Sequence, residues 1–111
     1  MTIKELKWNT PTRYGQKLMT AEILKSTPAL YATEGQEEKT VTAHYFIGGY
    51  DAYLLELDPE SGEAFGYAGF NGEVEPGYFS IPDLAKTCVQ GFCVERDIRF
   101  KPCNISTILN R

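Results

Sequence analysis

The chain has 111 residues, of which 42% are hydrophobic and 23% are charged, and its formal net charge is -4. This length predicts one domain over residues 1–111, large enough to bury roughly two-thirds of its unfolded surface without a metal or disulfide. No apolar run approaches the roughly 20 residues that span a bilayer, which excludes a transmembrane helix and predicts no membrane partner.

The charge is distributed unevenly along the chain. Residues 31–83 contain eleven acidic residues and a single basic one, Lys39, whereas residues 1–30 and 84–111 each contain five basic and two acidic residues. Nonspecific binding of nucleic acid requires clustered Lys and Arg that neutralise phosphates, so none is expected from the acidic centre. Two interpretations remain for this centre, a solvated acidic face or a surface that binds a basic partner.

The three cysteines, Cys88, Cys93 and Cys103, are an odd number, and the sequence starts without the apolar stretch of a secretory signal peptide. We therefore expect thiols packed as small hydrophobic groups, no complete disulfide framework and a cytoplasmic location. A zinc site that joins His44 to these cysteines is an alternative, but the close Cys-x2-Cys pair of common structural sites is missing. No cofactor or metal is predicted.

In chain order, the first predicted element is a short helix over Gln16–Ser26, which Pro28 ends. Residues 1–15 are expected to form a loose N-terminal segment. After the helix, Glu34–Lys39 is a polar loop rich in Glu and Gln, and we expect it to be mobile.

Residues 40–79 then contain three or four short segments with alternating apolar and polar residues. The first three span Thr40–Ile47, Ala52–Asp58 and Glu63–Phe70. Turn residues interrupt the stretch at positions 48–49, 59–62 and 71–72, because Gly and Asn tolerate the positive φ of tight turns and Pro presets the first turn dihedral. The pattern predicts an α+β fold with a single antiparallel meander sheet of four or five strands and two short helices.

The register of the first hairpin decides which residues lie beside His44. If the apolar positions of both strands share one face, the loop between them must contain an odd number of residues. A three-residue loop then places Thr42 opposite Glu56, and a five-residue loop places His44 there, so His44 and Glu56 come within side-chain reach. For the third strand we favour the register in which its small residues lie beside a helix, over the one that buries Phe65 and Tyr67.

The second helix has the clearest local signal. Ser80 and Asp83 have capping-box spacing, and Phe79 and Leu84 have the spacing of a hydrophobic staple. They predict a helix over Ile81–Val89 that stops at the following glycine.

The remaining elements are a last strand over Val94–Phe100 and a last helical turn over Asn104–Leu109. Arg96 lies on the face of that strand that also carries Val94, Ile98 and Phe100. An unpaired buried charge is costly on such an apolar face. We expect a buried Arg96 bonded to Glu34, to Glu56 or to backbone carbonyls. A ligand-anion site at Arg96 is the alternative.

A catalytic interpretation centres on His44, the single histidine, with Glu56, Arg96 and Asp97. An imidazole oriented by a carboxylate can act as a general base, which would fit a small hydrolase or a nucleotide-handling enzyme. No Ser or Cys nucleophile stands in a recognised motif. The glycine repeat over residues 66–72 is not a phosphate loop, because it lies inside a strand and its turn rather than before a helix.

An ordered series of segments resembles a known family. The segments are Leu30–Glu34, Leu57–Gly66, Gly77–Ser80, Val94–Asp97 and Phe100–Pro102. Over about residues 18–109 they are similar to the family catalogued as domain of unknown function 2958, which occurs in bacterial, plasmid and phage-borne sequences. The resemblance implies a mobile-element or bacterial accessory protein and no particular activity. The segment Cys88–Cys93 departs from the family pattern, which leaves the end of the second helix open.

The leading functional prediction is a non-enzymatic, cytoplasmic interaction protein of a phage or plasmid. Its partner would be a host protein, such as a nucleic-acid-binding defence component, and an anti-defence or antirestriction role fits this chemistry. The predicted binding surface combines acidic residues, exposed aromatic residues and one arginine. These are Glu60, Glu63, Glu73, Glu75, Tyr50, Phe65, Tyr67, Phe70 and Arg96.

Overall fold

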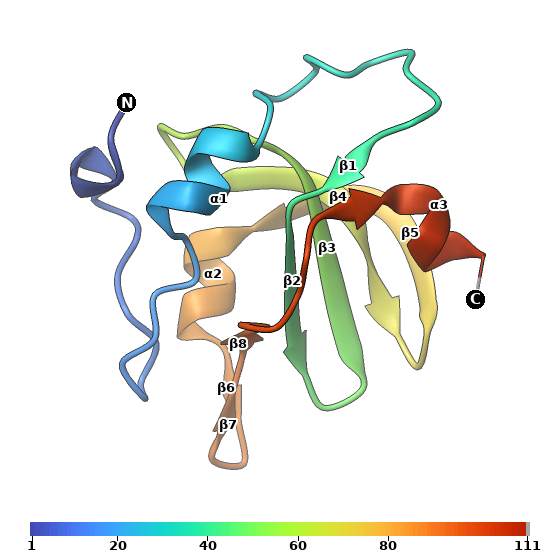
Figure 1. Cartoon of the computed structure of the whole chain (residues 1–111). Coiled ribbons are helices and arrows are strands. Elements are labelled where there is room, and N and C mark those ends of the chain that lie inside the picture. The colour runs from blue at the N-terminus through green and yellow to red at the C-terminus, as the bar shows by residue number, and fades with distance from the viewer. Residues whose placement is uncertain (111) are drawn as a thin grey trace.

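The computed structural model describes residues 1–110 and contains a five-stranded antiparallel sheet with shorter elements on both faces (Figure 1). Its strand order is β5-β4-β3-β2-β8. The strands span Ala43–Ile47 (β2), Tyr50–Leu57 (β3), Glu63–Phe70 (β4), Glu73–Ser80 (β5) and Glu95–Arg96 (β8). Because β2 to β5 pair with one another in chain order, the predicted α+β fold with an antiparallel meander is confirmed.

The shorter elements are three α-helices, one 3-10 helix and two small strand pairs. The helices span Ala21–Ser26 (α1), Ile81–Lys86 (α2) and Ile105–Leu109 (α3), and the 3-10 helix spans Ile3–Glu5. The pairs are Thr40–Val41 (β1) with Cys103–Asn104 (β9), and Cys88–Val89 (β6) with Phe92–Cys93 (β7). The predicted last helical turn is therefore α3. No helix among residues 1–110 is long and apolar enough to cross a membrane.

The larger core lies between one face of the sheet and the N-terminal segment, α1 and α2, which Figure 1 shows together on one side. Tyr45 is fully buried there and donates its hydroxyl to the carbonyl oxygen of Leu18 at 2.8 Å. Burial raises the pKa of Tyr45, so the phenol stays protonated as a hydrogen-bond donor.

The N-terminal segment is part of this core, so the prediction of a loose residues 1–15 is wrong. Leu6 is 5% exposed, and Asn9 bonds both the amide and the carbonyl of Met19 at 3.3 and 3.0 Å. Trp8 donates its indole N–H to the carbonyl of Pro59 at 2.8 Å. This segment is held by tertiary contacts of scattered apolar residues. Because these residues show no helical or strand periodicity, the sequence pattern does not identify the segment as ordered.

A smaller core lies on the opposite face, under α3 and β9. Val41, Tyr53, Leu55 and Ile105 are its buried members. Both faces of β3 are therefore covered, which is why six of its eight residues are buried. Burial on two faces removes the alternation that would have identified a single apolar face.

The first hairpin turn contains two residues, Gly48 and Gly49, because Ile47 pairs with Tyr50. The predicted odd-numbered loop is wrong. His44 consequently lies opposite Tyr53 and not opposite or diagonal to Glu56.

A β-bulge lies between β3 and β4. Leu54 pairs with Gly66 and Glu56 pairs with Phe65, which leaves Leu55 as the extra residue. A Cβ atom at position 66 would lie 1.8 Å from the carbonyl oxygen of Tyr53, so glycine is required there. The favoured register is thus confirmed at the Glu56–Phe65 pair. The face of β4 that carries its small residues lies toward α2 in the larger core.

Two helices are shorter than predicted. α1 begins after Thr20, whose hydroxyl accepts the amide of Ile23 at 3.1 Å, rather than at residue 16. α2 begins as predicted, with the Ser80 hydroxyl accepting the amide of Asp83 at 3.2 Å, but it ends at Lys86. The residues expected to form the end of this helix belong to the β6–β7 hairpin instead. Gln90 (φ 50°) and its neighbouring glycine (φ 86°) form the tight turn of that hairpin.

The last strand is also shorter than predicted. Only Glu95–Arg96 pairs with β2, and the chain then turns at Asp97, whose carboxylate accepts the amide of Arg99 at 3.0 Å. This local bond of an Asp to the backbone two residues later competes with a strand. Ile98, expected on the apolar face, is 77% exposed.

Candidate functional site

An apolar groove lies at the end of the molecule where β2 turns into β3 and where the β6–β7 hairpin projects (Figure 1). Its volume is about 670 Å³. We call it the hairpin groove. Its apolar side chains come mainly from the first hairpin, from β4, from α2 and from the β6–β7 hairpin, and they include Ile47, Tyr50, Phe70, Leu84, Val89 and Phe92.

The edges of the hairpin groove are large apolar side chains that face water. Phe70 is 65% exposed, Phe92 is 72% exposed and Val89 is 58% exposed. The rings of Tyr50 and Phe70 pack with their centroids 5.1 Å apart, and burial raises the pKa of Tyr50. Exposed apolar residues that cluster around a hollow are typical of interaction sites, whereas scattered ones carry no such meaning.

Two of the four predicted glutamates lie on β5, the strand next to Phe70, and neither of them lines the groove itself. Glu73 is paired with Phe70 and Glu75 with Ala68, so both lie on the face of the sheet that carries Phe70. Both side chains are exposed. The structure therefore brings together Tyr50, Phe70, Glu73 and Glu75 from the predicted surface.

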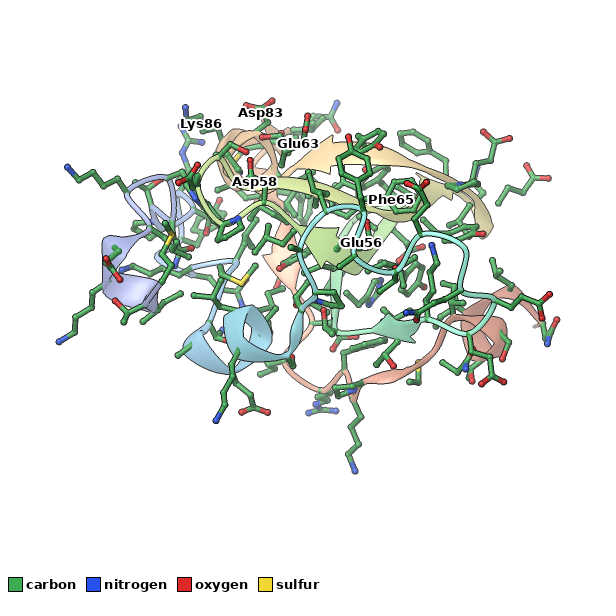
Figure 2. The ribbon with its side chains drawn as sticks, turned by 90° about the horizontal axis from the view of Figure 1, so that it is seen from above. Glu56, Asp58, Glu63, Phe65, Asp83 and Lys86 are labelled. Carbon is green, nitrogen blue, oxygen red and sulfur yellow. A yellow bond between two sulfur atoms is a disulfide. The ribbon has the colours of Figure 1, made fainter. Side chains whose placement is uncertain are left out.

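The other two glutamates lie elsewhere. Glu63 occupies the opposite end of β4, beside Asp58, and Glu60 belongs to the turn before it. Figure 2 shows Asp58, Glu63 and Asp83 at this end of the molecule, with Lys86 near them. The predicted acidic surface is thus divided between two ends of the sheet.

Phe65 and Tyr67 lie on the face of the sheet opposite the groove, against the smaller core. Phe65 packs edge-on against Tyr78 at 5.2 Å, and Lys39 lies 5.6 Å from the centroid of its ring. A hydrogen bond with the side chain of Tyr31 raises the pKa of Tyr78 to about 12. These aromatic residues therefore do not contribute to the hairpin groove.

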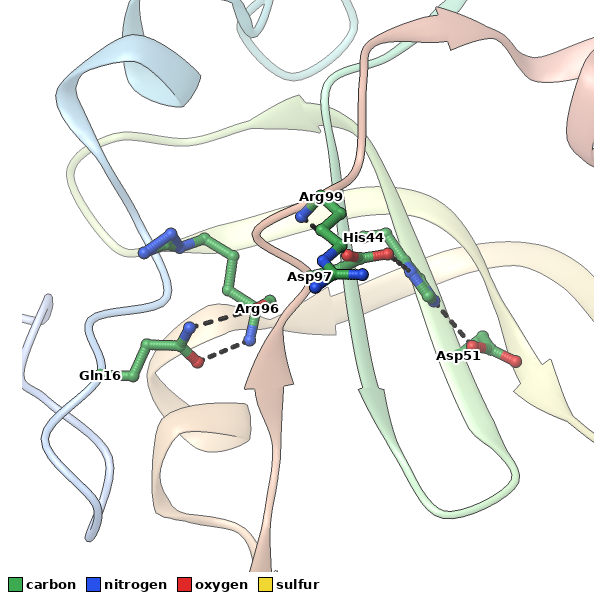
Figure 3. A network of polar contacts seen from close by, with 6 residues as sticks. All are labelled: Gln16, His44, Asp51, Arg96, Asp97 and Arg99. Carbon is green, nitrogen blue, oxygen red and sulfur yellow. Dashed lines mark hydrogen bonds and ion pairs between the residues drawn. The ribbon is translucent and has the colours of Figure 1, made fainter.

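His44 is held between two carboxylates (Figure 3). Its Nε2 lies 2.7 Å from Oδ1 of Asp51, its Nδ1 lies 3.0 Å from Oδ2 of Asp97, and its ring stacks on Tyr53 at 4.6 Å. Both ring nitrogens of His44 are therefore engaged by carboxylate oxygens. The bond from His44 lowers the pKa of Asp97 below its usual range.

This geometry gives His44 no free ring nitrogen to act as a general base. His44 and Asp97 do lie together, as the catalytic interpretation requires, but Glu56 is absent from the group. The network joins β2, β3 and the turn after β8, and it therefore works as a structural link.

Glu56 has a different set of partners. Its carboxylate accepts the amide of Tyr31 at 2.8 Å and the amide of Thr33 at 3.1 Å, and it also accepts the hydroxyl of Thr33. Burial acts to raise the pKa of Glu56, but these bonds outweigh it and lower the pKa. Glu56 therefore anchors the turn over residues 31–35, the start of the loop expected to be mobile.

Arg96 is half-buried, and its Nε donates to the carbonyl of Lys17 at 3.3 Å. Its backbone amide and carbonyl bond the side-chain amide of Gln16 at 2.7 and 3.1 Å (Figure 3). A bond to a backbone carbonyl is therefore confirmed. Of the predicted partners, the structure thus shows a backbone carbonyl, while the carboxylate of Glu56 bonds residues 31 and 33.

The cysteines differ from their expected packing as thiols. Cys88 and Cys93 form a disulfide across the β6–β7 hairpin, whereas Cys103 is a free, half-buried thiol. The alternative zinc set of His44 with three cysteines is not assembled, since two of its members bond each other. Residues 1–110 contain no other group of three or more metal-binding side chains.

Sequence reasoning missed one wall of the groove. Val89 was predicted as the last residue of a helix and Phe92 was assigned to no element, whereas they flank a two-residue turn. The available signal was Gln90-Gly91 between paired apolar residues, with a cysteine at the matching position on each side. This arrangement predicts a hairpin with a cross-strand disulfide, because residues equidistant from a two-residue turn lie opposite each other.

No family model matches the chain, and no curated protein and no solved structure matches it. The resemblance to domain of unknown function 2958 stays a prediction that rests on the residues given above.

Proposed function

We propose that the protein is a non-enzymatic binding module that holds an apolar, basic segment of a partner protein in the hairpin groove. The observation that carries this proposal is the position of Phe70 and Phe92, two exposed aromatic side chains at the edges of an apolar hollow. The exposed Glu73 and Glu75 lie on the sheet face that carries Phe70. Catalysis has no comparable support, because both ring nitrogens of His44 are bonded.

The apolar part of the groove supplies the affinity in this proposal. Aromatic anchors that become fully desolvated at the centre of an interface carry most of the binding free energy. Phe70 and Phe92 expose more than half of their surface in the free chain, so they gain the most from a partner that covers them.

The carboxylates define the partner's charge. Glu73 and Glu75 extend from the edge strand next to Phe70, and a partner with Lys or Arg beside its apolar side chains is complementary to them. The acidic charge of residues 31–83 adds a longer-range attraction for such a segment.

The partner segment lies in the groove and does not extend the sheet. β5 is an edge strand that contains Pro76, which has no amide hydrogen to offer to an added strand. Proline and charged residues on an edge strand oppose pairing with another strand. An amphipathic helix is the segment that best fits an apolar groove with a charged edge.

The wider role follows from the sequence. A mobile-element protein that occupies a basic surface of a cytoplasmic host protein, such as a nucleic-acid-binding defence component, would act as an anti-defence or antirestriction inhibitor. This part of the proposal rests on the family resemblance and on the acidic charge.

The test uses two synthetic peptides that share an apolar leucine face, one with a lysine face and one with a glutamate face. Fluorescence anisotropy of the labelled peptides measures the dissociation constant for the whole chain. We expect binding of the lysine peptide, loss of about tenfold or more in affinity for Phe70→Ala, and little binding of the glutamate peptide.

The matched control is Tyr31→Ala, which removes an aromatic ring of similar exposure on another part of the surface. It should leave the affinity unchanged. The double reversal Glu73→Lys with Glu75→Lys should invert the preference between the two peptides. Equal affinities of Phe70→Ala and the unchanged chain for the lysine peptide would refute the groove as the binding site.

A further inference from the structure

We propose that the Cys88–Cys93 disulfide is a site of thiol–disulfide exchange, and that its reduction weakens binding in the hairpin groove. This inference concerns the regulation of the proposed function and rests on it.

The disulfide and the groove wall occupy the same two short strands. Cys88 is paired with Cys93, and the next pair toward the turn is Val89 with Phe92. Side chains alternate between the two sides of a hairpin ribbon, so the disulfide holds one side while Val89 and Phe92 line the groove from the other.

Few other contacts hold this hairpin. Each of its strands has two residues, and an isolated two-stranded hairpin is marginally stable at best. Its base is fixed by the bond from the Val94 amide to the Thr87 carbonyl at 3.1 Å, and its turn receives one bond, from the Tyr14 hydroxyl to the Gly91 carbonyl. Between base and turn, the disulfide is the covalent clamp that keeps the two strands together.

The two cysteine residues of the disulfide differ in exposure. Cys93 is 4% exposed, whereas Cys88 is half-buried. A thiolate of a dithiol reductant therefore attacks the sulfur of Cys88, a mixed disulfide forms there, and the sulfur of Cys93 leaves as a thiolate that takes up a proton. The second thiol of the reductant then attacks the mixed disulfide, releases Cys88 as a thiol, and leaves the reductant as a disulfide.

The consequence is a groove that exists in two states. In the oxidised chain, Val89 and Phe92 are held in place before the partner arrives, so binding does not have to order them. In the reduced chain this ordering accompanies binding, and the affinity falls. In a reducing compartment, such a disulfide is a transient, regulatory one rather than a permanent one.

The experiment measures two quantities on the whole chain, before and after reduction by dithiothreitol, a small dithiol. The first is the affinity for the lysine-faced peptide, which should fall about tenfold on reduction. The second is amide hydrogen exchange over residues 88–93, which should accelerate on reduction while β3 and β4 remain protected.

Two variants serve as controls. Cys103→Ser should keep the full redox response, because Cys103 is outside the hairpin. The double variant Cys88→Ser with Cys93→Ser should bind the peptide with the affinity of the reduced chain, both with and without dithiothreitol. Protection of its β3 and β4 amides from hydrogen exchange would show that this variant is folded.

The outcomes separate the two proposals. Equal affinity and equal exchange in both redox states would overturn the redox clamp even if the peptide binds. Faster exchange in the hairpin without peptide binding in either state would support the clamp and refute the groove as a docking site.

Discussion

Glu56 offers the sharpest test of how the fold is held together. Replacing it by alanine removes a carboxylate that accepts three hydrogen bonds, from the amides of Tyr31 and Thr33 and from the Thr33 hydroxyl. A hydrogen bond to a charged group contributes about 1.5–3 kcal/mol. Because Tyr31 is 61% exposed, its amide can partly regain water, so we expect Glu56→Ala to lower the free energy of unfolding by about 3 kcal/mol.

The assay is urea denaturation followed by circular dichroism, for the unchanged chain, Glu56→Ala and Glu56→Gln. The glutamine side chain keeps one acceptor oxygen, so Glu56→Gln should lower the free energy of unfolding by about half as much as Glu56→Ala. Glu63→Ala is the matched control, because its side chain is exposed and the change should cost less than about 0.5 kcal/mol.

The pH dependence of the Glu56 effect has a defined sign. The folded-state pKa of Glu56 is lowered, so its contribution to stability is complete above the ordinary glutamate pKa and is lost as the pH falls through the lowered value. The difference between the unchanged chain and Glu56→Ala should therefore shrink in acid. Equal stability of the two at neutral pH, or a difference that persists in strong acid, would refute the anchoring role.

Other predictions concern the bulge and the histidine. Gly66→Ala should destabilise the fold by about 1–3 kcal/mol in thermal denaturation, because the new Cβ would clash with the Tyr53 carbonyl. Gly77→Ala in the facing strand should cost far less, because a Cβ at that position contacts nothing. A double-mutant cycle of His44→Ala and Asp97→Ala should give a coupling free energy of about 1 kcal/mol at neutral pH, and additive effects would disprove the link. Because the pKa of Asp97 is lowered, this coupling should disappear as the pH falls through that lowered value.

The sequence predicted the elements whose signals are local. Asn71 and Gly72 both adopt positive φ in the turn between β4 and β5, and Ser80 caps α2, as the residue types indicate. The meander followed from such turns. The N-terminal segment was not predictable in this way, because Leu6 and Trp8 are fixed by contacts with distant residues.

The site was predicted only in part, for a physical reason. Tyr50, Phe70 and Glu73 were predicted as members of one surface and lie on one face of the sheet, whereas Phe65 lies on the opposite face. Phe65 and Phe70 are five residues apart in one strand, so the alternation of side chains by itself separates them. The two-residue turn separated His44 from Glu56, and the bulge made Leu55 the extra residue of β3. A sequence pattern does not show a bulge when the residues on both faces of the strand are apolar.

A nuclear magnetic resonance titration of the isotope-labelled chain with the lysine-faced peptide locates the binding surface residue by residue. We expect the amide signals that shift to belong to the walls of the hairpin groove and to the neighbouring strand β5, around Tyr50, Phe70, Glu73 and Phe92. Signals around Phe65 and Tyr78 on the other face should stay in place. Shifts confined to that other face, or no shifts at saturating peptide, would contradict the account.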